Sequence, residues 1–295
     1  MRNIIIGIIC VLGLTPINAQ LTDLVRVEYT YFPQRESNNS FRRFRSFVNI
    51  PLKLNEKGAY LVPKLEYRNV DFKYNDPTPF NTDPLNSFQH FEVGLGYTFK
   101  LNTDWRFVTQ VGLIAASNFE TNKIIRDDLI TTATTLFVKD KKGSALNKPS
   151  TLVLGLAYST TSGRPLPLPI VSYTKKVTDK FSYTAGIPKS GLKYKINDKH
   201  VLQTFVTLDG FFANVQNNKV IFKNNEEIDV DNISLTIVLA GIGYEYFFTK
   251  HLALYTFAGY TLLNDIRLRN IDKDDVLTIN DLKSFYARAG IKFKI

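Results

Sequence analysis

The chain has 295 residues, of which 44% are hydrophobic and 13% aromatic, and its formal net charge is +10. Beyond the first twenty residues it has no run of about 20 consecutive apolar residues, which excludes transmembrane helices from that part. The single cysteine, Cys10, lies within those first residues, so the remainder offers no disulfide, thiolate metal site or cysteine nucleophile. Abundant phenylalanine and tyrosine favour strands over helices.

The N-terminal segment has the order of a secretory signal peptide. Arg2 precedes an apolar run over 4–14, and small and polar residues follow up to Ala19. The run is too short to span a bilayer as a helix. We predict cleavage after Ala19, with residues 1–19 as the signal peptide and residues 20–295 as one exported domain.

Apolar and polar residues alternate from Val25 onward. In 25–31, valines and tyrosines fall on one side of an extended strand, and arginine, glutamate and threonine fall on the other. The pattern is especially regular in 90–101, where large apolar residues alternate with histidine, glutamate and glycine. The fourteen predicted strands are 25–31, 43–53, 60–74, 90–101, 105–112, 129–139, 150–159, 168–177, 181–187, 192–196, 201–214, 233–248, 251–263 and 285–295.

The number of strands and the regularity of one strand are left open by the sequence. If the short pair between 181 and 196 is a loop, the count falls to about twelve. In 233–248 the apolar alternation of Ile233 to Leu239 loses phase before Ile242, which suggests a β-bulge there.

The last eleven residues, F-Y-A-R-A-G-I-K-F-K-I, show the alternation most fully. Six apolar residues fall on one face, and tyrosine, arginine, glycine and lysine fall on the other. A strand of about ten residues can cross a bilayer at a tilt with its apolar face toward lipid. A half-buried strand of a soluble sheet has the same period, so this strand alone does not decide between the two.

The connections distinguish a membrane barrel from a soluble sheet. Tight turns occur at 102–104, 177–180, 197–200 and 249–251, whereas the intervening connections at 75–86, 117–128, 216–232 and 264–281 are longer. Short turns at one end and long loops at the other are typical of outer-membrane barrels. The predicted fold is therefore all-β, a transmembrane up-and-down antiparallel β-barrel.

Two further segments indicate a family. A-Y-S-T-T-S-G-R-P-L-P-L-P at 157–169 and T-L-D-G-F-F-A-N at 207–214, together with the terminal strand, resemble the outer-membrane β-barrel proteins of unknown function from Bacteroidota. The resemblance implies a barrel in the outer membrane of a Gram-negative cell. It supplies no activity and no catalytic residues.

The proline-rich part of the first segment cannot form a normal strand ladder. Pro165, Pro167 and Pro169 remove three N–H donors from the same edge. We predict an extended loop at the long-loop end, either stiff and external or folded into the mouth with Arg164 facing the lumen.

Catalytic and metal sites are not predicted. Asp198 and His200 imitate a protease pair but lie at a short turn, and Ser87 and His90 fall on opposite faces of one strand. A barrel hydrolase that uses His90 is kept as an unlikely alternative. The acidic residues of 226–231 and 272–275 are interpreted as solvated loop charge instead of calcium ligands, and no cofactor is implied.

The charged faces of the strands give the predicted function. A charge at mid-bilayer on the lipid face would cost about 2–4 kcal/mol, so these side chains should point inward. The residues predicted to line the lumen are Arg43, Arg45, Lys64, Glu66, Arg68, His90, Glu92, Arg106, Arg164 and Arg288. We predict a narrow, porin-like channel or transporter for small solutes whose basic excess favours anions. A structural or surface-interaction barrel with a plugged lumen is the alternative.

The predicted partners follow from the fold and location. They are outer-membrane lipid and lipopolysaccharide, the barrel-assembly machinery through the C-terminal strand, and small solutes. Nucleic acid is not expected, because the basic residues alternate along strands and form no continuous stripe.

Overall fold

The computed structural model of the protein describes residues 23–34, 39–76, 82–144, 148–160, 167–223, 226–272 and 274–294. The predicted signal peptide 1–19 and Arg164 lie outside the described residues. Within the described ranges, no helix is long and apolar enough to cross a membrane.

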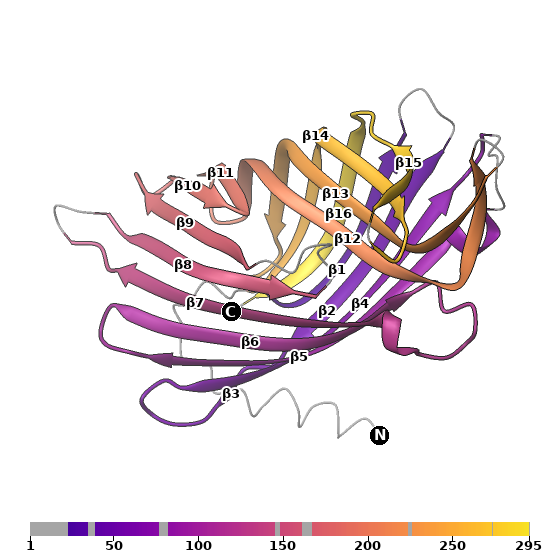
Figure 1. Ribbon diagram of the computed structural model, residues 1–295. Helices are drawn as coiled ribbons and strands as arrows, with labels where there is room; N and C mark the ends of the chain where they lie inside the picture. Colours follow the sequence, from indigo (N-terminus) through magenta and orange to yellow (C-terminus); the bar gives the residue numbers. More distant parts are fainter. Residues whose placement is uncertain are drawn as a thin grey trace, which may run out of the picture.

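Fourteen strands form one closed ring (Figure 1). The sheet has sixteen strands, but β3 (Leu52–Lys53) and β15 (Asp275–Asn280) are short additions outside the ring. The ring strands are β1 (Asp23–Pro33), β2 (Ser40–Asn49), β4 (Tyr60–Lys73), β5 (Ser87–Lys100), β6 (Trp105–Ser117), β7 (Leu129–Lys141), β8 (Ser150–Ser159), β9 (Leu168–Lys176), β10 (Phe181–Ile187), β11 (Lys189–Lys195), β12 (His200–Lys223), β13 (Glu226–Phe247), β14 (Leu252–Arg269) and β16 (Phe285–Lys294).

Each ring strand pairs antiparallel with the next along the chain, and β16 pairs with both β14 and β1, which closes the barrel. The prediction of about fourteen strands is confirmed, and the short hairpin β10–β11 belongs to the wall. The tight turns lie together at one end, which we call the short-turn end. The 3-10 helices η1 (Asp83–Leu85) and η2 (Arg126–Asp128) lie at the other, the long-loop end.

The outer surface is apolar because the alternation turns its hydrophobic face outward. Along β5, Phe91, Val93 and Leu95 are 45%, 63% and 45% exposed, whereas Glu92 between them is buried. In β16, Ile291 and Phe293 are likewise exposed. In a water-soluble fold these residues would pack in the core, so their exposure fits a wall that faces lipid.

Aromatic side chains border the apolar surface at two levels. Near the short turns, Tyr97, Phe99, Phe107 and Phe137 form a row with ring centroids 5.3 to 5.5 Å apart. Phe44, Tyr67, Phe91 and Phe119 form a second row. Along a strand tilted by about 40°, the eight residue steps from Phe91 to Phe99 span roughly 20 Å of membrane normal. The two rows therefore have the spacing of interfacial girdles.

The predicted loops 216–232 and 264–281 are wrong in large part. The backbone ladder of β12 and β13 continues with one irregularity as far as Lys223 and Glu226, and β14 continues to Arg269 and pairs there with β15. Asparagine and acidic residues made these segments resemble loops. They remain in strand conformation because the pairing register of the preceding part of each strand continues into them.

The change of phase before Ile242 is not a bulge in β13. Ile233 and Leu239 face inward and are fully buried, whereas Ile242 faces outward and is 66% exposed, with the β12–β13 register continuous between them. The irregularity lies in β14, where Leu262 has no partner opposite Val238 and Leu239. The sequence pattern changes because the barrel interior itself becomes apolar at this level.

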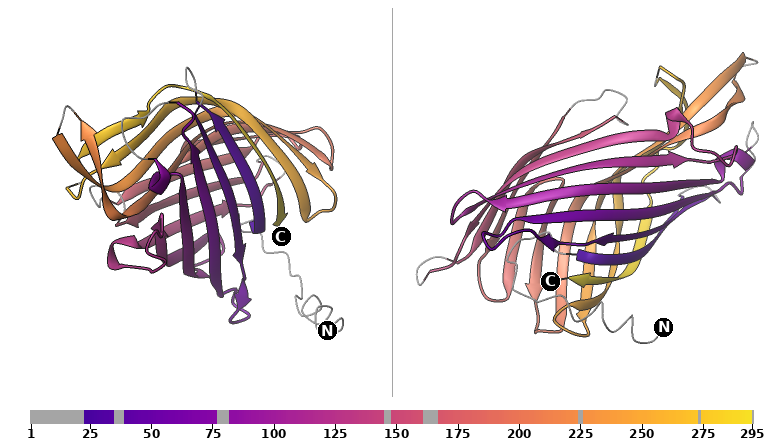
Figure 2. Two further views of the ribbon diagram at one scale, coloured as in Figure 1. Left: turned by 90° about the vertical axis from the view of Figure 1, so that its right-hand side faces the viewer. Right: turned by 90° about the horizontal axis from the view of Figure 1, so that it is seen from below.

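The barrel wall is short at β10–β11 and extends much further toward the long-loop end at β12–β14. Both strands of the β10–β11 hairpin have seven residues, and the Leu208 amide donates to the Pro188 carbonyl at the tip. Beyond Leu208, β12 runs on across the interior and meets β6 through the pair Asn214 and Ser117 (Figure 1). Figure 2 shows the β12–β13 extension projecting from the long-loop end.

Candidate functional site

One side of the barrel interior is filled by an ionic network. It joins β1, β2, β4, β5, β12 and β16 through Arg26, Glu28, Arg43, Arg45, Lys64, Glu66, Arg68, Glu92, Asp209 and Arg288. Because side chains of alternate residues on these strands point inward, neighbouring strands bring opposite charges to the same height. The network follows directly from strand register.

Glu66 binds three cations at once. Arg45 donates two hydrogen bonds to its carboxylate, with N–O distances of 2.8 and 3.0 Å, and Arg68 donates from β4 itself. Lys64 lies 3.0 Å from Glu66 and bonds Glu92 at 2.8 Å. The Glu66 side chain is fully buried, so these partners replace water as its source of solvation.

Asp209 crosses the lumen. It accepts two hydrogen bonds from Arg43 of β2, at 3.0 and 2.6 Å, and one from Arg288 of β16 at 2.9 Å. Four strands separate β12 from β2 along the shorter arc of the ring, so this contact joins two distant parts of the wall through the interior. Glu28 completes the cluster by accepting a hydrogen bond of 2.5 Å from the Tyr255 hydroxyl.

Above the ionic network, toward the long-loop end, the interior is a dry apolar core. Its members come from both arcs of the ring and include Phe32, Phe41, Phe72, Phe88, Phe211, Ile233 and Leu268. The rings of Phe88 and Phe211, from β5 and β12, meet edge to face at 6.1 Å between centroids. This side of the barrel is therefore closed at the long-loop end.

A buried polar cluster holds the β12 extension against β6. The Ser117 hydroxyl donates to the Asn214 carbonyl at 3.2 Å, and the Asn214 and Gln216 amides donate to Asp128 at 2.8 and 2.7 Å. The Thr121 hydroxyl donates to Gln216 at 2.7 Å. Four of these residues are less than a tenth exposed, so the contact is a built interface between the extension and the long-loop end.

The opposite side of the interior, along β7 to β10, is lined by small hydroxyl side chains. We call it the hydroxyl face: Thr132, Thr134, Ser172, Thr174, Ser182 and Thr184. Each is partly exposed, in contrast to the buried charges across the lumen. The Thr174 and Thr184 hydroxyls lie 2.8 Å apart. A hydroxyl has one donor and two acceptor sites, so this partly exposed face keeps hydrogen-bonding capacity beyond the contacts of Thr132, Thr174 and Thr184.

Lysines gather beside the hydroxyl face. Glu245 of β13 accepts from Lys292 at 2.6 Å, from the Gln203 amide at 3.0 Å and from Lys193 at 3.4 Å. Lys189, also on the inner face of β11, is exposed. The positive charges here exceed the single carboxylate.

The structure describes nine of the ten residues predicted to line the lumen, the exception being Arg164. All nine lie at inward-facing positions. Those that are buried are Arg43, Glu66, His90, Glu92 and Arg106, and those partly buried are Arg45, Lys64, Arg68 and Arg288. Eight of them lie in or beside the ionic network, whereas Arg106 bonds the Gly58 carbonyl at 3.2 Å. That they line a water-filled path stays a prediction.

Sequence reasoning missed three carboxylates and the hydroxyl face. Glu28, Asp209 and Glu245 each stand at an inward-facing position among apolar residues, which is a signal that strand parity offers. Serine and threonine give no such signal, because they are tolerated on either face of a strand.

Catalytic pairs do not form among the residues considered. The Ser87 hydroxyl donates to Asp71 at 2.9 Å on the outer face, while His90 is buried inside. At the short turns, Asp198 pairs with Lys195 at 2.7 Å and His200 lies 2.5 Å from the Tyr244 hydroxyl. No hydrolase mechanism is built from these contacts.

Two groups of acidic residues could suggest metal binding. Ligand atoms of Glu66, His90 and Glu92 lie within 4.8 Å of one another. Both carboxylates already bind Lys64, so a divalent cation would meet positive charge there. At the start of β15, burial raises the pKa of Asp275, but hydrogen bonds from Arg269 and Arg267 outweigh it and lower that pKa.

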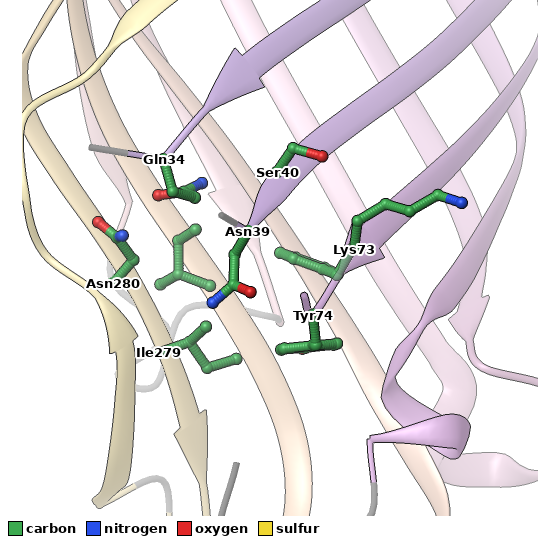
Figure 3. A pocket seen from close by; sticks show the side chains of 9 residues that line it. Gln34, Asn39, Ser40, Lys73, Tyr74, Ile279 and Asn280 are labelled. Carbon is green, nitrogen blue, oxygen red and sulfur yellow. The ribbon is translucent and has the colours of Figure 1, made fainter. Parts of the chain in front are cut away.

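A small cavity lies between β2, β4, β14 and β15 at the long-loop end (Figure 3). Its volume is about 10 Å³, which is room for one water molecule. Gln34, Tyr74 and Ile279 are among its lining residues. It is too small to receive a solute.

A closed fourteen-stranded antiparallel barrel with an apolar exterior and an ionic interior defines the class of membrane-spanning β-barrels. Within that class, the chain belongs to the family described as Domain of unknown function (DUF6268), whose model matches residues 17–294. No curated protein sequence matches the chain.

Solved structures similar to this chain are outer-membrane barrels. The COG4313 outer membrane channel from Pseudomonas putida F1 is 12% identical, with 96% of this chain and 100% of that chain covered and a TM-score of 0.44. The NanC porin is 11% identical, with coverages of 92% and 100% and a TM-score of 0.39. LpxR from Salmonella typhimurium is 9% identical, with the same coverages and TM-score.

Proposed function

We propose that the protein is an outer-membrane channel that passes small solutes, with a preference for anions, along the hydroxyl face. It would reach the outer membrane after removal of the predicted signal peptide 1–19. The observation that carries the proposal is the unequal filling of the interior. Buried charges and apolar residues fill one side, while the hydroxyl face remains accessible to water.

The free edge of β12 supports a watery compartment. Within the described part of the chain, β12 has no partner on its β11 side between Leu208 and Asn214. The N–H and C=O groups of such an edge cannot face hydrocarbon unpaired. Side chains satisfy two of them, because the Gly210 N–H donates to Asp209 and the Leu208 carbonyl accepts from the Thr207 hydroxyl. The remaining groups fit a watery compartment above the β10–β11 tip.

The charge of this compartment favours anions. Lys189 and Lys193 face it from β11, and Lys292 reaches it from β16. Glu245 neutralises a part of this charge, so the local field stays positive. A ring of basic side chains raises the local concentration of anions and repels cations.

Planar bilayers test the proposal. The purified protein should give discrete conductance steps, and in a salt gradient the reversal potential should indicate anion preference. Thr184→Trp, which places a large ring on the hydroxyl face, should lower the unit conductance. Tyr183→Trp, on the adjacent lipid-facing position of β10, is the matched control and should leave the conductance unchanged. An electrically silent wild-type protein would contradict the proposal.

A plugged barrel that acts through its surface is the second candidate. The dry apolar core and the cross-lumen contacts of Asp209 favour it, because they close one side of the interior. In that case the long-loop end, including the β12–β13 extension, would carry the function. Trimming the extension would then abolish the surface function of the protein and leave solute uptake unchanged.

The remaining partners stay predictions. The lipid-facing band would contact outer-membrane lipid and lipopolysaccharide, and β16 would present the terminal strand to the barrel-assembly machinery. The Bacteroidota lineage likewise remains a prediction from resemblance.

A further inference from the structure

A row of aromatic rings lies on the inner wall between two lysines. Tyr255 and Phe257 of β14 have ring centroids 5.1 Å apart, and Phe257 and Phe205 of β12 have centroids 5.2 Å apart. Lys292 lies over Tyr255, with its nitrogen 5.3 Å from the ring centroid. Lys189 lies over the other end, 5.5 Å from Phe205 and 5.8 Å from Phe257.

Lys189 belongs to the interior cations of the described part of the chain, Arg106 and Lys294 among them, that form no ion pair with a carboxylate. Lys292 and Lys193 share Glu245, and the arginines of the ionic network are paired with Glu28, Glu66 or Asp209. Among the described residues, none forms an ion pair or hydrogen bond with the Lys189 amine. Its side chain is exposed to the compartment, so the amine keeps its capacity to bind an anion.

The combination of a free amine and a half-buried ring selects a class of ligand. The amine can donate a charge-assisted hydrogen bond to a carboxylate or similar oxyanion. Phe257 is only partly buried and offers apolar contact beside the amine. A small inorganic anion would satisfy the amine alone and leave the ring uncovered.

We propose that Lys189 and the partly buried ring of Phe257, which packs on the buried Phe205, form a binding site for small organic anions that carry an aromatic or other flat apolar body. This inference rests on the proposed channel, because the ligand reaches the site through the same compartment. It names the class of solute that the compartment holds, beyond a general preference for anions.

Binding of 4-fluorobenzoate to the purified protein in detergent micelles tests this site. Fluorine NMR of the ligand reports binding without any conductance. Wild-type protein should bind 4-fluorobenzoate more tightly than 4-fluorobenzyl alcohol, and acetate should be a poor competitor. Lys189→Gln should weaken 4-fluorobenzoate binding about tenfold, the loss expected for one hydrogen bond to a charged group.

Lys139→Gln is the matched control. Lys139 also lies over an aromatic ring, 5.1 Å from the centroid of Trp105, but on the outer face near the short turns. Its replacement should leave the affinity unchanged. Equal effects of the two substitutions, or tighter binding of the neutral alcohol, would overturn the site.

The outcomes also separate this inference from the channel. Binding that depends on Lys189 in a protein that is silent in bilayers would support the site and contradict transport. If the protein conducts but Lys189→Gln leaves its 4-fluorobenzoate affinity unchanged, transport is supported and the site is overturned.

Discussion

Replacing Glu66 with alanine will lower the free energy of unfolding of the barrel by about 3–5 kcal/mol, the usual cost of leaving buried charges without their partner. Arg45, Arg68 and Lys64 all bind this carboxylate, and its side chain is fully buried. After the substitution, three cations would share the nearby carboxylates Glu28 and Glu92. Urea unfolding of the protein in lipid vesicles measures the loss.

Glu56→Ala is the control for this experiment. Glu56 also forms an ion pair, with Lys53 at 2.7 Å, but its side chain is 92% exposed at a short turn. Exposed pairs contribute little because water solvates both charges. Glu56→Ala should therefore have the same free energy of unfolding as the wild type. An equally small effect of Glu66→Ala would show that the ionic network is solvated instead of buried.

Asp209→Ala will destabilise the barrel by a similar amount, about 3–5 kcal/mol, because it leaves Arg43 without its carboxylate and Arg288 with only Glu28, 4.0 Å away. The Arg43 side chain is 3% exposed and that of Arg288 is 11% exposed, so water cannot replace the carboxylate. Combining Asp209→Ala with Arg43→Ala should cost less than the sum of the single changes. We expect a coupling of about 0.5–3 kcal/mol, as for residues in direct contact.

The exposed pair Lys195 and Asp198 provides the comparison. They lie 2.7 Å apart at a short turn and should show no measurable coupling in the same cycle. Additive effects of the Asp209 and Arg43 substitutions would mean that these side chains do not meet across the lumen.

Strand parity made most of the fold predictable. The alternation in 90–101 and in the terminal strand placed each charged side chain opposite an apolar one, and the structure has those faces inward and outward as expected. The short turns were also readable, because their polar residues interrupt the alternation. Both features depend on neighbours in sequence, which is why a single chain suffices to find them.

The filling of the interior was not predictable in the same way. Asp209 and Arg43 are 166 residues apart in sequence, and their contact depends on β12 leaving β11 after Leu208. Strand parity alone gives no reason why the apolar face from Ile233 to Leu239 should point away from lipid. These residues face inward because the walls approach each other there, a property of the whole ring that no local pattern encodes.

Cysteine labelling tests the central claim, that water fills the compartment beside the hydroxyl face, most directly. Ser172→Cys changes one inward-facing hydroxyl of β9 to a thiol of nearly equal size, and Val171→Cys places a thiol at the adjacent lipid-facing position, which is 48% exposed. In lipid vesicles, a charged thiol reagent that cannot cross membranes should label Ser172→Cys and spare Val171→Cys, with wild type as the baseline. Labelling of Val171→Cys with protection of Ser172→Cys would contradict the account.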